Sequence, residues 1–282
     1  MTFTTLVSVE DLARHIDDPD WVILDARFDI DNEDAAKVTY AIEHVPGARQ
    51  ADLADHMSGE VIAGKTARRP LPDPEVFAET LRAWGIDAGT QVVIYDSMNG
   101  IMAASRLWVM MKWAGHDTAA VLDGGYQAWV ESGGVVTADV PRVTPTDYVP
   151  VFDHGLIMDL DEVQEVSSRG GALLFDSRSQ TDGIPSHDAV AGRIPGSGWA
   201  DRALNSTANG RWRDSAELAE HYRALVGDRD PHEVVFYCGS GVTGAQNVLG
   251  MSHAGLPGSR LYVGSWSEWI LDPTRPIQPI ND

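Results

Sequence analysis

The stretch VVFYCGSGVTG, residues 234–244, contains the only cysteine of the chain and indicates its fold. Residues 234–237 are β-branched and aromatic, which predicts a short buried strand. The glycines that follow permit a tight loop, and the periodic segment 245–254 predicts a helix. Cys238 is therefore expected at a turn from a strand to a helix.

That position predicts a reactive thiol. A helix N-terminus and unpaired loop N–H groups favour negative charge, and they lower the pKa of a cysteine from its ordinary ~8.5. A buried structural cysteine is the alternative, but such a residue needs no glycine-rich loop after it. We therefore predict that Cys238 is a nucleophile.

The two halves of the chain repeat one series of motifs, which predicts duplicated domains. Each half has a strand ending in Asp-x-Arg, a Pro-Gly turn, an apolar strand and a final motif that contains Trp. These motifs occupy residues 22–27, 43–48, 91–96 and 121–129 in the first half, and residues 173–178, 192–197, 233–238 and 261–269 in the second. Asp96 takes the place of Cys238 in the first half.

Each half alternates strands with helices, which predicts an α/β fold with a mostly parallel sheet covered by helices on both faces. We place the domains at residues 1–140 and 156–282, joined by a proline-rich extended linker, residues 141–155. Residues 58–73 form a long polar loop, whose basic residues are either solvated or line the cleft between the domains. Apolar periodicity predicts helices over residues 9–16, 74–84, 103–114, 160–168 and 215–225, with Pro74 and Ser215 as start signals.

Composition excludes several classes of function. The chain has 21 basic and 42 acidic side chains, a net charge of −21, which argues against nucleic acids and anionic membranes as partners. The N-terminus lacks a basic segment followed by an apolar one, and no stretch of about 18 apolar residues occurs, so we expect a cytoplasmic protein. One cysteine excludes an internal disulfide, and no Cys/His cluster suggests a metal site.

These motifs together resemble those of the tandem-domain rhodanese-type sulfurtransferases, the family of thiosulfate and 3-mercaptopyruvate sulfurtransferases. The resemblance implies two tandem rhodanese-like domains, the first inactive because it carries Asp96. It also implies that Cys238 takes a sulfane sulfur from a small anionic donor and passes it to cyanide or a thiol, which a thioredoxin-like protein could supply, with no cofactor. The motifs are HVPGA (44–48), VLDGGYQAW (121–129), CGSGVT (238–243) and GSWSEW (264–269).

The resemblance also implies what the loop after Cys238 does. The loop residues surround the sulfur with backbone N–H groups, and a Gly-Ser pair at its second and third positions accompanies use of 3-mercaptopyruvate. A basic pair there accompanies use of thiosulfate. The loop residues in question are Gly239, Ser240, Gly241, Val242 and Thr243.

The resemblance to the 3-mercaptopyruvate type also implies a proton relay, which would here consist of Ser240, His44 and Asp34. Cleavage of the carbon–sulfur bond leaves an enolate that needs a proton, and a serine with a histidine behind it could deliver one. Alternatively, His44 only stabilises its turn and Asp34 is a surface charge.

The chain departs from the family at the donor-binding arginines. Asp182 stands where the family has an arginine four residues after Arg178, and Arg193 replaces the histidine of the second HIPG motif. Either Arg178, Arg193 or Arg202 holds the donor, or the donor differs from both standard ones. Arg178 could instead pair with Asp176 or with a carboxylate at the domain interface.

Two other classes of function stay open. A cysteine-dependent phosphatase needs an arginine after five intervening residues, and that position is Gly244. The second is a non-enzymatic sulfur carrier or regulatory binding protein that kept the fold with an impaired donor site.

Overall fold

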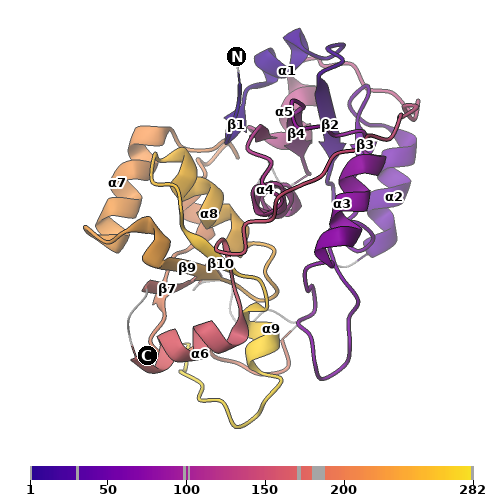
Figure 1. Cartoon of the computed structure of the whole chain (residues 1–282). Coiled ribbons are helices and arrows are strands. Elements are labelled where there is room, and N and C mark those ends of the chain that lie inside the picture. Colours follow the sequence, from indigo (N-terminus) through magenta and orange to yellow (C-terminus); the bar gives the residue numbers. More distant parts are fainter. Residues whose placement is uncertain are drawn as a thin grey trace. The chain divides into compact units, whose positions relative to one another are not determined.

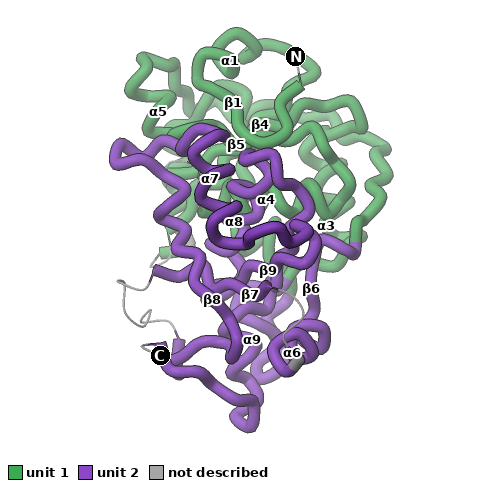
Figure 2. Tube along the Cα trace, turned by 90° about the vertical axis from the view of Figure 1, so that its left-hand side faces the viewer, with its two compact units in different colours: residues 1–59, 71–153 green, residues 60–70, 154–282 purple. Residues whose placement is uncertain are grey.

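The computed structural model describes residues 2–29, 32–97, 100, 102–169, 173–179 and 188–280. They form two compact units, which Figures 1 and 2 show. Unit 1 comprises Met1–Gly59 and Leu71–Asp153, and unit 2 comprises Glu60–Pro70 and His154–Asp282. The chain therefore enters unit 2 twice, first through a short excursion and then with its whole second half.

Unit 1 is built on a five-stranded parallel sheet with the strand order β1-β5-β4-β2-β3. Each central strand is an apolar run, as expected for a sheet buried on both faces. In chain order, the elements are β1 (Leu6–Val7), α1 (Val9–Arg14), β2 (Trp21–Asp25), α2 (Glu33–Ile42), β3 (Arg49–Gln50), α3 (Pro74–Ala83), β4 (Gln91–Tyr95), α4 (Ala103–Trp113), β5 (Ala119–Leu122) and α5 (Gly125–Glu131).

Unit 2 repeats this architecture with the strand order β6-β10-β9-β7-β8, again all parallel. The identical order confirms the predicted duplication and the predicted α/β class. In chain order, the elements are β6 (Ile157–Met158), α6 (Leu160–Arg169), β7 (Leu173–Asp176), β8 (Gly198–Trp199), the 3₁₀ helix η1 (Arg202–Asn205), α7 (Ser215–Val226), the 3₁₀ helix η2 (Pro231–Glu233), β9 (Val234–Tyr237), α8 (Gly244–His253), β10 (Arg260–Tyr262) and α9 (Ser265–Trp269).

Helices cover both faces of each sheet because side chains alternate along every strand. In unit 1, Val93 and Tyr95 of β4 pack with α1 and α5, while α4 contacts β4 and β5. In unit 2, Val235 and Tyr237 of β9 pack with α6 and α9. Phe236, between them, points the other way and meets Tyr222 of α7.

The predicted helices are all present, with ends within two residues of those expected. Asp73 accepts a hydrogen bond from the Glu75 N–H at 2.9 Å and precedes Pro74, so α3 begins as predicted. Asp214 does the same for α7, accepting from Glu217 at 2.8 Å. Helices α2, α5 and α9 were not among the predictions.

The segment from residue 138 to residue 153 contains no helix or strand and runs along unit 1. The Thr146 N–H donates to the Arg82 carbonyl at 3.2 Å, and the Asp153 N–H donates to the Trp113 carbonyl at 2.7 Å. A side chain at Gly115 would lie 2.4 Å from the Val151 carbonyl oxygen. The segment is thus held closely by the ends of α3 and α4.

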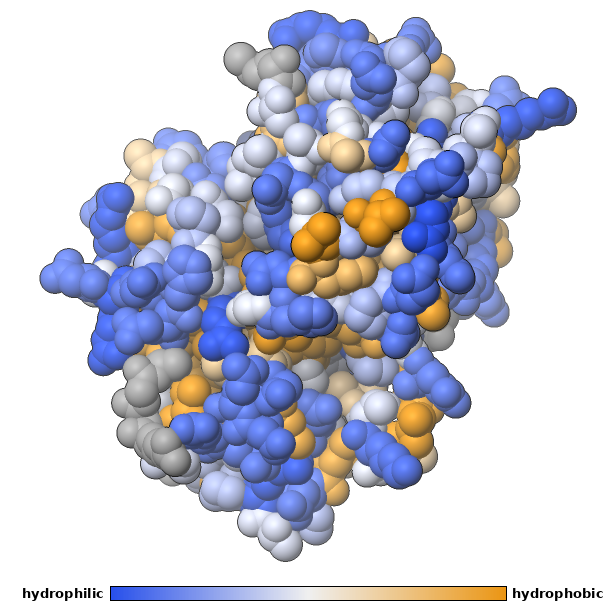
Figure 3. Space-filling view, in the orientation of Figure 1, coloured by the Kyte–Doolittle hydropathy of each residue, from blue (hydrophilic) through white to orange (hydrophobic). Residues whose placement is uncertain are grey.

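The exterior is mainly hydrophilic on the face that Figure 3 shows, with apolar residues scattered over it. The exposed large apolar side chains are mostly valines. Single apolar residues of this kind are normal on protein surfaces. None of the described helices combines the length and the apolarity needed to cross a bilayer.

Because of two of its histidines, we predict that unit 1 is less stable to unfolding in mild acid. Burial lowers the pKa of His56 and of His116 below the ordinary 6.5. His56 Nδ1 also accepts a hydrogen bond from the Asp52 N–H at 2.9 Å, which requires the neutral ring. Between the folded and unfolded pKa values the unfolded state binds more protons, so the free energy of unfolding should fall as the pH drops below about 6.5.

The measurement is urea unfolding at pH 7.5 and pH 5.5, followed by hydrogen exchange and mass spectrometry of peptides from unit 1. We expect a lower midpoint at pH 5.5, and a smaller difference between the two pH values in the double variant His56→Gln/His116→Gln. An unchanged pH difference in the double variant would show that these rings do not carry the effect.

Candidate active site

Cys238 directly follows β9, at the carboxyl edge of the unit 2 sheet, and is buried with 1% of its surface exposed. This edge is where open parallel sheets bind ligands. The Cys238 N–H donates to Ser265 Oγ at 3.1 Å, and Ser265 Oγ lies 4.0 Å from Sγ. Ser265, the first residue of α9, therefore touches both the backbone and the thiol of Cys238.

The start of α9 also holds the loop after the cysteine. The Trp266 N–H donates to the Cys238 carbonyl at 3.0 Å, and the Ser267 N–H donates to the Gly239 carbonyl at 2.9 Å. Ser265 has a φ of 54° and is the only non-glycine residue with positive φ in the described parts of the chain. Such strain persists only where the surroundings hold it, and it concentrates at functional sites.

Gly241 must be glycine in this loop. Its φ is 73°, and a Cβ there would lie 2.2 Å from the Val263 carbonyl oxygen. Gly241 and Val242 are buried, while Gly239, Ser240 and Thr243 are half-buried. The loop is therefore packed underneath and partly open above, around the residues that follow the cysteine.

Unit 1 shows what the equivalent loop does with a negative charge. Asp96 follows β4 as Cys238 follows β9, and its buried carboxylate accepts from the N–H groups of Gly100 at 2.9 Å, Met102 at 3.0 Å and Ala104 at 3.0 Å. Helix α4 begins at Ala103, directly beyond. The carboxylate thus fills a ring of loop and helix N-terminal amides, the kind of site that stabilises an anion.

Arg178 is tied down by an ion pair at the end of β7. Its Nη2 donates to Asp176 at 2.6 Å and to the Gly192 carbonyl at 2.7 Å, and its guanidinium lies over the Trp266 ring. Burial, the largest single effect, lowers the pKa of Arg178, but the hydrogen bond to Asp176 and the nearby negative charges together outweigh it, and the pKa is raised overall. Only 8% of its side chain is exposed.

The same arrangement recurs in unit 1, where Arg27 pairs with Asp25 and donates to the Glu43 carbonyl. Its guanidinium lies over Tyr126. Unit 1 has no cysteine, so this pairing serves the architecture of the strand end in both units. A donor-binding role for Arg178 stays a prediction.

The other two arginines predicted to bind the donor lie in different settings. Arg193 is buried, donates to the Ser197 carbonyl and lies over Trp199. Arg202 begins η1 and is half-buried, with its N–H 3.4 Å from the Ser177 carbonyl. Asp182 lies outside the described residues. The donor-binding roles of Arg193 and Arg202 also stay predictions.

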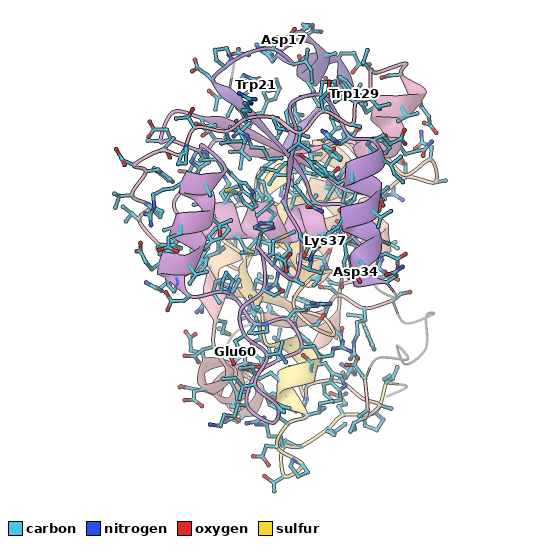
Figure 4. All side chains as sticks on the ribbon, turned by 90° about the vertical axis from the view of Figure 1, so that its right-hand side faces the viewer. Asp17, Trp21, Asp34, Lys37, Glu60 and Trp129 are labelled. Carbon is cyan, nitrogen blue, oxygen red and sulfur yellow. The ribbon has the colours of Figure 1, made fainter. Side chains whose placement is uncertain are left out.

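The structure does not bring His44 and Asp34 together. His44 is fully buried, with Nδ1 2.8 Å from the Tyr40 carbonyl, Nε2 3.2 Å from the Asp139 carbonyl and its ring stacked on Tyr40. Asp34 is exposed in the first turn of α2, one turn before Lys37 (Figure 4). No hydrogen bond joins His44 to Asp34 among the described residues.

Sequence reasoning missed Ser265 as a site residue. The signal was present, because GSWSEW was recognised as a repeated motif, but nothing in it indicated that its serine would contact the cysteine. It also missed Asp188, whose side chain is fully buried in unit 2. Both residues lie beside the loop through contacts that sequence spacing does not reveal.

Comparisons with known proteins agree with this geometry. The model of the rhodanese-like domain matches residues 8–132 and again residues 159–272. A probable 3-mercaptopyruvate sulfurtransferase from Pseudomonas aeruginosa is 38% identical, covering 98% of this chain and 99% of its own. Thiosulfate/3-mercaptopyruvate sulfurtransferase 2 from Arabidopsis thaliana is 30% identical, covering 96% of this chain and 86% of its own.

Among solved structures, the 3-mercaptopyruvate sulfurtransferase from Leishmania major superposes with a TM-score of 0.82 at 29% identity, over 94% of this chain and 73% of that one. The chain belongs to the rhodanese-like family, with one such domain in each half. It is a sulfurtransferase, and the non-enzymatic alternative is not favoured.

Proposed function

We propose that this sulfurtransferase takes sulfur from 3-mercaptopyruvate and passes it, through a persulfide on Cys238, to cyanide or to a thiol such as that of a thioredoxin-like protein. The observation that carries the proposal is the loop itself. Cys238 directly follows a buried strand, and the next two residues, Gly239 and Ser240, bring a half-buried hydroxyl and no charge. The names of the relatives from Pseudomonas and Leishmania support the same donor.

The first half-reaction breaks a carbon–sulfur bond. The Cys238 thiolate attacks the sulfur of 3-mercaptopyruvate, a sulfur–sulfur bond forms, and the electron pair of the carbon–sulfur bond passes to the pyruvate enolate. One proton then converts the enolate to pyruvate. Ser240 is the proton donor in this proposal, because no hydrogen bond to a described residue of unit 2 engages its hydroxyl.

The second half-reaction restores the thiolate. The acceptor, a thiolate or cyanide, attacks the outer sulfur of the persulfide, and the sulfur–sulfur electron pair returns to Cys238. The product is a persulfide of the acceptor or thiocyanate. A reducing compartment such as the cytoplasm, where a single cysteine remains a thiol, belongs to the proposal.

The relay through His44 and Asp34 stays a prediction. Both ring nitrogens of His44 face carbonyl oxygens of unit 1, which favours a structural role for this ring. These two contacts support the alternative expected from the sequence, that His44 stabilises its turn.

Intact mass spectrometry tests the proposal. After incubation with 3-mercaptopyruvate, the protein should gain about 32 Da, one sulfur atom, and cyanide should remove it. The Ser240→Ala variant should load sulfur from 3-mercaptopyruvate about 10²-fold more slowly, because this is roughly the least that a general acid contributes. Loading from thiosulfate, whose leaving sulfite needs no proton, should change little in this variant.

Failure of 3-mercaptopyruvate to load Cys238 would overturn the proposed donor. Equal slowing with both donors would remove Ser240 from the role of proton donor, because that role applies only to the enolate.

A further inference from the structure

Residues Glu60–Pro70 form an excursion from unit 1 that packs on unit 2 (Figure 2). Its ends meet, since a Cβ on Gly59 would lie 2.5 Å from the Leu71 carbonyl oxygen. The part of it that returns to unit 1 is anchored to α9, where the Arg68 N–H donates to Ser267 Oγ at 3.2 Å. Ser267 in turn holds the Gly239 carbonyl. The excursion is therefore connected to the active loop through one residue of α9.

The side chain of Arg68 lies against the residue that follows the nucleophile. A Cβ on Gly239 would lie 3.1 Å from Arg68 Nη2 and 3.4 Å from Asp188 Oδ2. A side chain at position 239 would come into close contact with both groups, whereas glycine leaves room for them. The Arg68 guanidinium, from a segment about 170 residues earlier in the chain, thus lies beside Gly239, in a loop that has no charged residue of its own.

Asp188 links Arg68 to the ion pair at the end of β7. Its carboxylate is fully buried, 3.2 Å from Arg68 Nη2 and 3.9 Å from Arg178 Nη1. Arg178 is 8% exposed and bonded to Asp176, whereas 35% of the Arg68 side chain is exposed. Of these two arginines, Arg68 is therefore the more exposed to solvent.

We propose that Arg68 binds the carboxylate of the sulfur donor above Gly239, and that Asp188 holds its guanidinium in place while offsetting part of its charge. Arginine suits this task because its planar fork pairs with a carboxylate through two parallel hydrogen bonds. The offset by Asp188 favours a donor with one negative charge at this point over a more highly charged one. The role of Arg68 rests on the proposed donor, but its charge can be tested without that donor.

Alkylation of Cys238 by two reagents of similar size tests the charge. Iodoacetate is an anion and iodoacetamide is neutral, and Cys238 is the only cysteine, so mass spectrometry reports one site. The rate constant for iodoacetate divided by that for iodoacetamide should fall about tenfold in Arg68→Ala, a change of about 1.4 kcal/mol. It should be largely retained in Arg68→Lys and should rise in Asp188→Asn.

Lys65→Ala is the matched control, because it removes an exposed positive charge from the same excursion. Its ratio should equal that of the unmodified protein. Steady-state kinetics with 3-mercaptopyruvate should show a higher KM in Arg68→Ala with kcat changed much less, whereas misplacement of the loop would slow both alkylating reagents and lower kcat.

An unchanged ratio in Arg68→Ala, or an equal fall in Lys65→Ala, would overturn the proposal. If Arg68→Ala does not fold, as judged by circular dichroism, Arg68→Gln takes its place, since it removes the charge but keeps a polar side chain with a hydrogen-bond donor. If the ratio falls as expected but 3-mercaptopyruvate does not load Cys238, the anion site stands and the proposed donor is wrong.

Discussion

Cys238→Ser should abolish persulfide formation and lower the rate of sulfur transfer by about 10⁴-fold or more. The change replaces one atom in a buried position, so the loop contacts to Ser265, Trp266 and Ser267 remain available. A hydroxyl, however, is not ionised near neutral pH and forms no sulfur–sulfur bond. The loss should therefore fall on chemistry and not on folding.

Thiocyanate production from 3-mercaptopyruvate and cyanide measures this loss, and intact mass measures the missing adduct of about 32 Da. Unfolding in urea should stay close to that of the unmodified protein. A Cys238→Ser variant that still transfers sulfur would show that the nucleophile lies elsewhere or that the acceptor attacks the donor directly.

Asp96→Ala should destabilise unit 1 by about 3 kcal/mol or more, because it leaves the buried N–H groups of Gly100, Met102 and Ala104 without their acceptor. Each charge-assisted bond to a backbone amide contributes roughly 1.5–3 kcal/mol. Asp96→Asn should recover only part of the loss, since its NH₂ group would face one or more of these donors.

Asp17→Ala is the matched control, because Asp17 is an exposed carboxylate of unit 1, labelled in Figure 4. Hydrogen exchange followed by mass spectrometry localises the effect. Protection should fall in residues 91–113 of Asp96→Ala and stay unchanged in Asp17→Ala. A loss no greater than that of Asp17→Ala would show that the amides find other acceptors.

The comparison of the two units explains why a cysteine works in one and a carboxylate in the other. Both residues follow the fourth strand of a parallel sheet and precede a helix. The Asp96 carboxyl group accepts hydrogen bonds from the N–H groups of Gly100, Met102 and Ala104, which ties the loop to the start of α4. Cys238 brings a thiol, which in the proposed function accepts a sulfur atom from the donor and passes it to the acceptor.

The fold could be predicted in detail from the sequence because its signals are local. Continuous apolar runs predicted the central strands, and apolar residues at helical spacing, together with starts such as Pro74 and Ser215, predicted helices that are all present. Helices α2, α5 and α9 escaped prediction. The last two are only seven and five residues long and each directly follows a glycine, so that they have too few residues for a periodicity to show.

The candidate site was predictable only in part. The position of Cys238 followed from one stretch of residues, whereas the partners of the arginines did not. Arg178 could be read equally well as a donor ligand or as the partner of Asp176, and the structure shows the ion pair. For His44, spacing gave no indication that both ring nitrogens would meet carbonyl oxygens of its own unit.

The sequence by itself determined the duplicated α/β architecture, the strand-to-helix turn at Cys238 and the replacement of its counterpart by Asp96, because each depends on residues close together in the chain. Only the tertiary structure decided that Ser265 touches the thiol and that Arg68 reaches Gly239 across 170 intervening positions. Those contacts depend on how distant segments pack. No local preference encodes them, since a buried carboxylate such as Asp188 finds its partners only when the chain is folded.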